Sequence, residues 1–193
     1  MSAPLYIALL HYPVHDKNRK LVATAVTNVD VHDIGRLAAT YGLPGYFVVT
    51  PVEQQRALVH EMLGHWLTGE GAAYNPRRKQ ALELARVVAN LADAVDAVRE
   101  ATGRVPVTIG TSAGPRDGMV SYPEMRRLLD AWDGPAILAL GTGWGLEKQF
   151  QQSLDYHLAP IPGLADYNHL SVRSAAAIMV DRLLGREYSA GER

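Results

Sequence analysis

The sequence predicts an α/β protein with a mostly parallel sheet covered by helices on both faces. Stretches typical of strands alternate with amphipathic stretches typical of helices along almost the whole chain, which is the order of a parallel sheet built from strand–helix units. The candidate strands, such as 5–10 and 136–140, are continuously apolar, as expected for strands buried on both faces. We expect one domain over residues 1–185 and a disordered polar tail at 186–193.

The first half of the chain predicts three strands and two helices, bounded by proline, glycine or capping residues. The strands are expected at 5–10, 21–26 and 46–50, and the helices at 31–41 and 52–67. Asp30, or His32 with Asp33, can cap the first helix, which ends at Gly42. The apolar face of the second helix is formed by Leu58, Met62, Leu63 and Trp66.

The second half predicts a loop at 69–76 and then one long amphipathic helix over 77–101, ended by Gly103. A strand at 105–109, a loop at 110–115 and a helix at 123–132 follow. The chain then predicts a buried strand at 136–140, a glycine-rich turn, a short strand at 156–158 and a final helix over 169–184.

Composition limits the function classes. The 193 residues carry a net charge of −1 and contain no cysteine, so disulfides and thiolate chemistry are excluded. We see no apolar run near the roughly 20 residues that a membrane span needs, and we expect a cytoplasmic protein with no membrane partner. Because the chain is not basic, RNA binding would need local clusters such as Arg77-Arg78-Lys79, Arg126-Arg127 or the basic residues of 17–20.

Three common chemistries do not fit the sequence. In the turn 141–146 the third glycine comes one position too early for a dinucleotide site, and Ile161 stands where that site needs an acid. His60 and His65 are five residues apart, which places them about 140° apart around a helix rather than on one face for zinc. Ser112 follows a strand but lacks the Gly-x-Ser-x-Gly elbow of the α/β-hydrolases. We expect no metal.

The three loops of the last third, taken together, resemble the cofactor-binding half of the SPOUT methyltransferases. Their Pro-Met-x-Gly loop leads, at the same spacing, into Ser-Leu-Asn-Val-Ser-Val and an alanine-rich helix. This chain has Pro160-Ile161-Pro162-Gly163, then Tyr167-Asn168-His169-Leu170-Ser171-Val172 and the alanines from Ala175. The stretch 28–42 also resembles the first motif of the ribose-methylating branch, with Ile34, Arg36, Ala38 and Gly42 at matching positions.

Over about residues 6–185 the chain is similar to a small bacterial SPOUT family of S-adenosylmethionine (SAM)-dependent RNA methyltransferases. The resemblance rests on 11–14, 27–34, 141–146 and 167–173. It implies a deep C-terminal trefoil knot over about 105–185, a homodimer, a tRNA or rRNA substrate, and SAM held by three loops. The implied cofactor-binding residues are Thr111, Ser112, Ala113, Leu140, Gly141, Thr142, Gly143, Gly145, Leu146, Pro160, Ile161, Gly163, Tyr167, Asn168, His169, Leu170 and Ser171.

The resemblance makes Arg36 a catalytic candidate, with Asp30 and His169 as candidate proton acceptors. The ribose-methylating branch has asparagines where this chain has Asp30 and His169, and a glutamate where it has Gly143. The acceptor is therefore open between a ribose 2′-OH and a base nitrogen. The alternatives are a SPOUT-fold protein that binds SAM or RNA without turnover, and an unrelated α/β nucleotide-binding protein.

Overall fold

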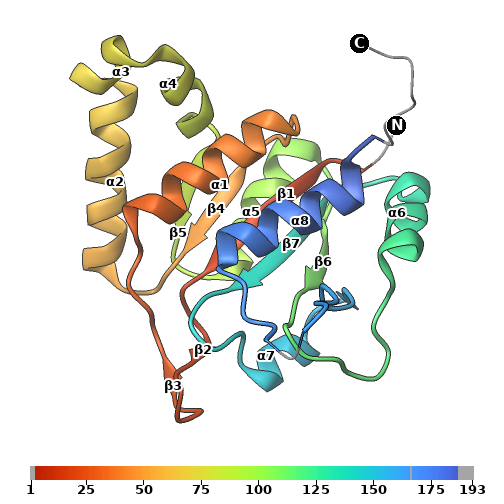
Figure 1. Ribbon diagram of the computed structural model, residues 1–193. Coiled ribbons are helices and arrows are strands. Elements are labelled where there is room, and N and C mark those ends of the chain that lie inside the picture. The colour runs from red at the N-terminus through yellow and green to blue at the C-terminus, as the bar shows by residue number, and fades with distance from the viewer. Residues whose placement is uncertain (1–2, 166, 187–193) are drawn as a thin grey trace.

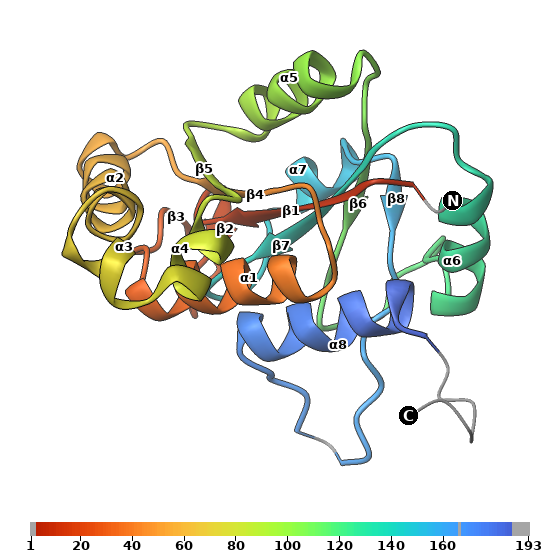
Figure 2. The same cartoon turned by 90° about the horizontal axis from the view of Figure 1, so that it is seen from above.

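The computed structural model describes residues 3–165 and 167–186 and shows a twisted parallel sheet between two helical layers (Figures 1 and 2). The six strands lie in the order β5-β4-β1-β7-β6-β8, and every neighbouring pair is parallel. Their bounds are β1 Leu5–Leu10, β4 Tyr46–Val49, β5 Ala85–Val88, β6 Val107–Gly110, β7 Ala136–Gly141 and β8 Tyr156–His157. The predicted fold class is confirmed.

The continuous apolar runs are explained by burial on both faces of the sheet. In β1, Leu5, Ile7 and Leu9 pack on one face, and the alternate residues pack on the other. Helices α1 (Asn28–Thr40) and α8 (Val172–Leu184) cover the first face, while α5 (Leu91–Thr102) covers the second (Figure 2).

The remaining elements lie around the sheet margins. The helices α2 (Glu53–Leu67), α3 (Glu70–Tyr74) and α4 (Pro76–Leu82) extend beyond the β5 edge, and α6 (Tyr122–Ala131) lies at the opposite edge (Figure 1). A separate antiparallel hairpin, β2 (Val14–His15) with β3 (Leu21–Val22), projects beside the short helix α7 (Lys148–Gln152).

The prediction of one long helix over 77–101 is wrong. This stretch forms all but the first residue of α4, then β5, then α5, because Val87 and Val88 extend the sheet by pairing with β4. Asn90 begins α5 by accepting a hydrogen bond from the Asp93 backbone amide at 2.9 Å. The expected loop 69–76 is also wrong in part, because it contains α3 and the first residue of α4.

Several boundaries differ from the sequence-based expectations. Thr27 caps the first helix, so Asp30, His32 and Asp33 lie inside it and do not cap it. Ser171 caps the final helix, which places His169 in the preceding loop rather than in the helix. In α2 the buried residues are Val59 and Leu63, while Leu58 is exposed. Only 21–22 of the expected strand 21–26 is paired. The helix α7 was not predicted.

No helix in the described part of the chain is long and apolar enough to cross a membrane. The expected tail lies almost entirely outside the described residues, and the trefoil knot stays a prediction.

Candidate functional site

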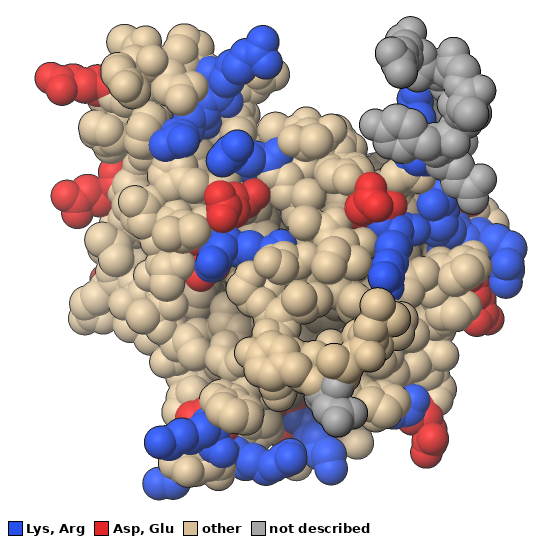
Figure 3. All heavy atoms as spheres, viewed as in Figure 1, with Lys and Arg blue, Asp and Glu red and all other residues tan. Residues whose placement is uncertain are grey.

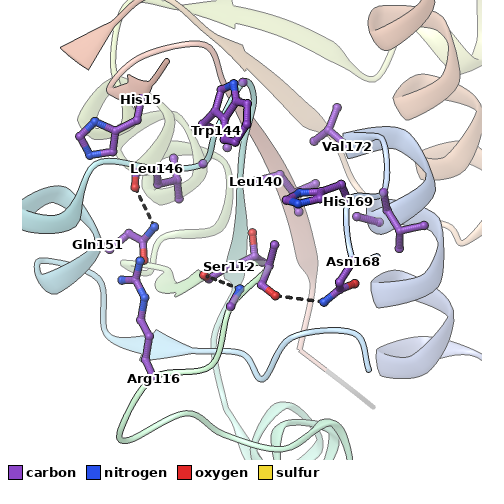
Figure 4. Close-up of a pocket in the computed structure, with 18 of the residues that line it drawn as sticks. His15, Ser112, Arg116, Leu140, Trp144, Leu146, Gln151, Asn168, His169 and Val172 are labelled. Carbon is purple, nitrogen blue, oxygen red and sulfur yellow. Dashed lines mark hydrogen bonds between the residues drawn. The ribbon is translucent and has the colours of Figure 1, made fainter. Parts of the chain in front are cut away.

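A cavity of about 870 Å³ opens at the carboxyl ends of β6 and β7 (Figure 4). Ligand sites in open parallel sheets lie at this edge. Its walls come from the loop after β6, the glycine-rich turn after β7, α8 with the loop that leads into it, the β2–β3 hairpin and α7. On the face seen in Figure 3, a hollow is bordered mostly by uncharged residues.

The glycine-rich turn is folded so tightly that it has no room for side chains at two positions. A Cβ on Gly141 would lie 2.7 Å from Cγ and 2.8 Å from the backbone nitrogen of Leu146. Gly143 has a φ of +59°, and its Cβ would lie 3.0 Å from the His15 carbonyl oxygen. Glycine is therefore required at both positions, and the backbone of the turn is left open to the cavity.

Hydrogen bonds join several of these segments to one another. The Asn168 side-chain amide donates to the Ala113 carbonyl at 3.1 Å, joining the α8 loop to the β6 loop (Figure 4). The Gln151 amide donates to the Leu146 carbonyl at 2.9 Å, and the Thr111 hydroxyl donates to the Ala139 carbonyl at 2.9 Å. These hydrogen bonds hold the lining segments in place around the cavity.

Aromatic side chains lie at the mouth of the cavity. Trp144 is 65% exposed and Tyr167 is 76% exposed. The His169 ring lies near both, with centroid distances of 6.2 Å to Trp144 and 5.5 Å to Tyr167. Such rings offer flat apolar faces that can stack on a planar base.

A second cavity of about 280 Å³ lies across the glycine-rich turn from the first. Gly141 and Gly143 line both cavities. The buried Asp30 carboxylate lies in this second cavity and pairs with the Arg173 guanidinium at 2.5 Å. The Thr27 hydroxyl donates to the other carboxylate oxygen of Asp30 at 2.6 Å. An acidic group is therefore fixed one backbone turn away from the large cavity.

A chain of polar side chains supports the turn from beneath. The buried His11 ring contacts the Thr24 hydroxyl at 3.0 Å, and Thr24 contacts the Thr142 hydroxyl at 2.5 Å. Thr142 in turn donates to the Leu10 carbonyl at 3.0 Å. Burial lowers the pKa of His11, although the charge of Asp30 opposes this shift. His11 is therefore held neutral under the turn.

The structure brings most of the predicted cofactor-binding residues together. The first cavity is lined by Thr111, Ser112, Ala113, Leu140, Gly141, Gly143, Gly145, Leu146, Ile161, Asn168, His169 and Leu170. Thr142 lies at the second cavity instead. Pro160, Gly163, Tyr167 and Ser171 line neither cavity; Ser171 caps α8, and Tyr167 contacts His169 at the mouth.

The three catalytic candidates are not gathered in one place within this chain. Asp30 lies in the second cavity and His169 lines the first. Arg36 lines neither; its side chain is 66% exposed on α1 and lies 4.0 Å from Asp33.

Sequence reasoning missed several residues that line the cavities. Trp144 and Arg173 lie within the motifs 141–146 and 167–173, most of whose other residues were already named as cofactor-binding candidates. That proximity was the signal that could have identified them. Arg19 stood in the basic stretch 17–20, a candidate for RNA binding but not for this cavity. His15, Arg116, Lys148 and Gln151 gave no signal, because only the tertiary fold brings them to the first cavity. Among the described residues, no group of three or more His, Asp or Glu side chains is placed to hold a metal ion.

Comparison with known proteins matches residues 4–185 to a family described as SAM-dependent RNA methyltransferase. A curated relative from Oleidesulfovibrio alaskensis, named tRNA (guanine-N(1)-)-methyltransferase, is 46% identical over 94% of this chain but only 42% of its own length. A protein from Aquifex aeolicus without an assigned function is 37% identical over 94% of this chain and 89% of its own.

Solved structures share the fold at low sequence identity. A probable methylase family protein from Haemophilus influenzae matches 95% of this chain and 66% of its own with a TM-score of 0.63 at 23% identity. An rRNA methyltransferase from Sinorhizobium meliloti, solved with SAM bound, matches 95% of this chain and 56% of its own with a TM-score of 0.56 at 17% identity. These matches support the overall fold alone.

Proposed function

This chain belongs to the family of SAM-dependent RNA methyltransferases, and from this premise we propose that it transfers a methyl group from SAM to a nucleotide of tRNA or rRNA. The observation that supports the proposal best is the glycine-rich turn, whose backbone borders both the large cavity and the small acidic one. The methyl donor SAM in the large cavity and the acceptor nucleotide at the small one would then be neighbours at this turn.

The large cavity fits SAM in size and chemistry. Its volume is in the range of small-molecule sites, and it combines apolar side chains such as Leu140, Leu146 and Ile161 with exposed backbone at the glycines. A Cβ at Gly141 would displace Leu146 and deform this cradle. When bound, SAM supplies an electrophilic methyl group on its sulfonium sulfur. The residues of the three loops would position that group and exclude water from it.

We propose Asp30 as the group that accepts the proton of the attacking hydroxyl or base nitrogen. Its carboxylate is buried, and Arg173 and Thr27 hold it in one orientation. Each carboxylate oxygen has two lone pairs, so both oxygens keep capacity for a further hydrogen bond. His169 lies at the mouth of the large cavity, where it would contact the cofactor.

Arg36 would need a second subunit to take part. It is exposed and lines neither cavity of its own chain. We propose a homodimer in which Arg36 reaches the active site of the partner subunit, and analytical ultracentrifugation of wild type and Arg36→Glu would test it. A monomer at working concentration would reject this part of the proposal.

The acceptor atom is not carried over from the relatives. This chain spans less than half the length of the two curated relatives whose names give a guanine-N1 activity, so that activity is said of those longer proteins. Both a base nitrogen and a ribose 2′-OH stay candidates for this chain.

The test has two stages, both done on the full chain. Calorimetric titration with SAM compares wild type with Gly143→Trp, and we expect saturable binding that the variant loses. Methyl transfer from labelled SAM to RNA from cells lacking this protein follows, with mass spectrometry of the nucleosides to identify the product. SAM binding with no methyl incorporation would favour a binding protein without turnover, and absence of SAM binding by the folded protein would reject the proposal.

A further inference from the structure

We infer that the β2–β3 hairpin, the loop after β6 and the start of α7 form a basic rim that binds the phosphate backbone of the RNA, next to the large cavity. The inference rests on the proposed function, because it gives a docking surface to the same substrate. The basic rim consists of Lys17, Arg19, Lys20, Arg116 and Lys148.

The hairpin is an integral part of the cavity wall. The backbone amide of His15 donates to the Gly145 carbonyl at 3.0 Å, and the amide of Trp144 donates to the His15 carbonyl at 3.0 Å. Val14 also pairs with Leu146 in an antiparallel bridge. The base of the hairpin is therefore joined to the glycine-rich turn.

The turn at the tip directs its basic side chains outward. The Asp16 carboxylate accepts hydrogen bonds from the backbone amides of Asn18 and Lys20, each at 2.8 Å. Arg19 adopts a left-handed conformation with φ of 59°, which is uncommon for a residue with a side chain. Lys17, Arg19 and Lys20 are all exposed as a result.

The carboxylates of the hairpin turn and of the start of α7, Asp16 and Glu147, accept hydrogen bonds from backbone amides. Asp16 is used within the turn, and the Glu147 carboxylate accepts from the Phe150 amide at 2.7 Å to begin α7. Hydrogen bonds from the amides of Gln149 and Phe150 hold the pKa of Glu147 below its usual range. Within the described part of the chain, none of the five rim cations forms an ion pair.

The rim therefore presents positive charge that has no internal partner. In Figure 3, Lys and Arg side chains gather at the lower end of the molecule, where Figure 1 places the hairpin and α7. Arg19, Arg116 and Lys148 also line the large cavity. Exposed Trp144 lies between this rim and His169, and a basic surface beside an exposed aromatic ring is typical of single-stranded RNA sites.

The basic cluster Arg77-Arg78-Lys79 is less suited to this role. The Arg78 guanidinium lies 4.9 Å from the centroid of the Trp66 ring, and Lys79 lies 4.0 Å from Glu83. Two of its three cations are thus engaged within the protein. The basic rim, in contrast, adjoins the segment Thr24 to Asp30 that lines the second cavity.

The test neutralises the hairpin tip without altering its turn. We compare wild type with the triple variant Lys17→Gln, Arg19→Gln, Lys20→Gln, because Asp16 bonds only to backbone amides there and should keep the turn intact. The matched control removes three exposed cations elsewhere, as Arg86→Gln, Arg99→Gln, Arg104→Gln. Binding of labelled bulk tRNA is measured across a salt series, and SAM affinity is measured by calorimetry.

We expect the hairpin variant to bind the tRNA about ten-fold more weakly at low salt, and the slope of log affinity against log salt to become shallower by about 2. SAM affinity is judged on the double variant Lys17→Gln, Lys20→Gln, which keeps the cavity-lining Arg19 and should stay within about two-fold of wild type. The control should match wild type in both measurements. The triple variant Arg77→Gln, Arg78→Gln, Lys79→Gln tests the alternative that the RNA binds at α4.

Three outcomes would overturn the inference. If the hairpin variant keeps the RNA affinity and salt slope of wild type while wild type methylates RNA, the rim inference is rejected and the proposed function stands. Equal losses of SAM and RNA affinity would assign the rim to the cofactor. A larger loss in the Arg77 arm would place the RNA on α4 instead. If wild type binds SAM but methylates no RNA, the proposed function fails, whereas the rim is still decided by the RNA affinities of the variants.

Discussion

Replacing Gly141 by alanine should damage stability and SAM binding together. The added methyl carbon would lie 2.7 Å from Leu146 Cγ and 2.8 Å from the Leu146 backbone nitrogen. The Leu146 side chain can shift, but the backbone nitrogen cannot move without opening the turn. Overpacking of this kind costs about 1–3 kcal/mol, which corresponds to a melting temperature lower by roughly 2–4 °C per kcal/mol for a chain of this size.

The same change should weaken SAM binding by at least about ten-fold, an effect of 1.4 kcal/mol. The reason is that Gly141 and Leu146 both line the large cavity, so a displaced turn changes the shape of the cradle itself. Urea unfolding gives the stability change, and calorimetric titration with SAM gives the affinity change. Both measurements are made on the same preparation.

The matched control is Gly64→Ala in α2. Gly64 is exposed, and a Cβ there would meet nothing within 4 Å. Because glycine inside a helix is less favourable than alanine by about 0.5–1 kcal/mol, this variant should be more stable than wild type and bind SAM equally well. If Gly141→Ala has the same stability and SAM affinity as wild type, the conclusion that the turn has no room for a side chain at this position is refuted.

Three further predictions concern the surroundings of the turn. Asp30→Asn should lower methyl transfer by roughly 10²–10⁴-fold and retain SAM affinity. It should also lower the unfolding free energy by about 1–3 kcal/mol, less than for a fully buried ion pair, because the Arg173 partner is only partly buried. Full activity would exclude Asp30 as the base. Below about pH 6.5, wild-type unfolding free energy should fall as pH falls, because the unfolded chain gains a proton that buried His11 resists. Urea titrations at several pH values should show a shallower fall in His11→Gln, and an identical slope would contradict this account. Ser171→Ala removes the cap of α8 and should cost about 1 kcal/mol by thermal melting, whereas no change would mean that the loop, not the cap, fixes the helix start.

The central strands and the glycine-rich turn could be predicted from sequence because their signals are local. A run such as Leu5–Leu10 is apolar at every position, and that pattern needs a sheet covered on both faces. The order α4-β5-α5 could not be predicted in the same way. β5 is a partly exposed edge strand whose alanine and arginine also favour helices, so its pairing with β4 decided the outcome.

The second cavity could not be predicted from local sequence patterns, because its residues are far apart in the chain. Arg173 and Asp30 are 143 positions apart, and Thr24 and Thr142 are 118 apart. Each of these residues has an ordinary interpretation in its own segment, such as a helix residue or a polar loop residue. Only the tertiary fold makes them neighbours, so the motif resemblance located the turn but not the acidic cavity beside it.

The position of β1 has a consequence for synthesis of the protein on the ribosome. β1 is made first, yet it lies inside the sheet between β4 and β7, and Leu10 meets Thr142 only across 132 positions of chain. At roughly 5–20 residues per second, about 7–26 seconds pass before that partner is translated. During this interval one edge of an entirely apolar strand has no neighbour. Nascent chains stalled before β7 should therefore be the species that aggregate and that need chaperone protection most.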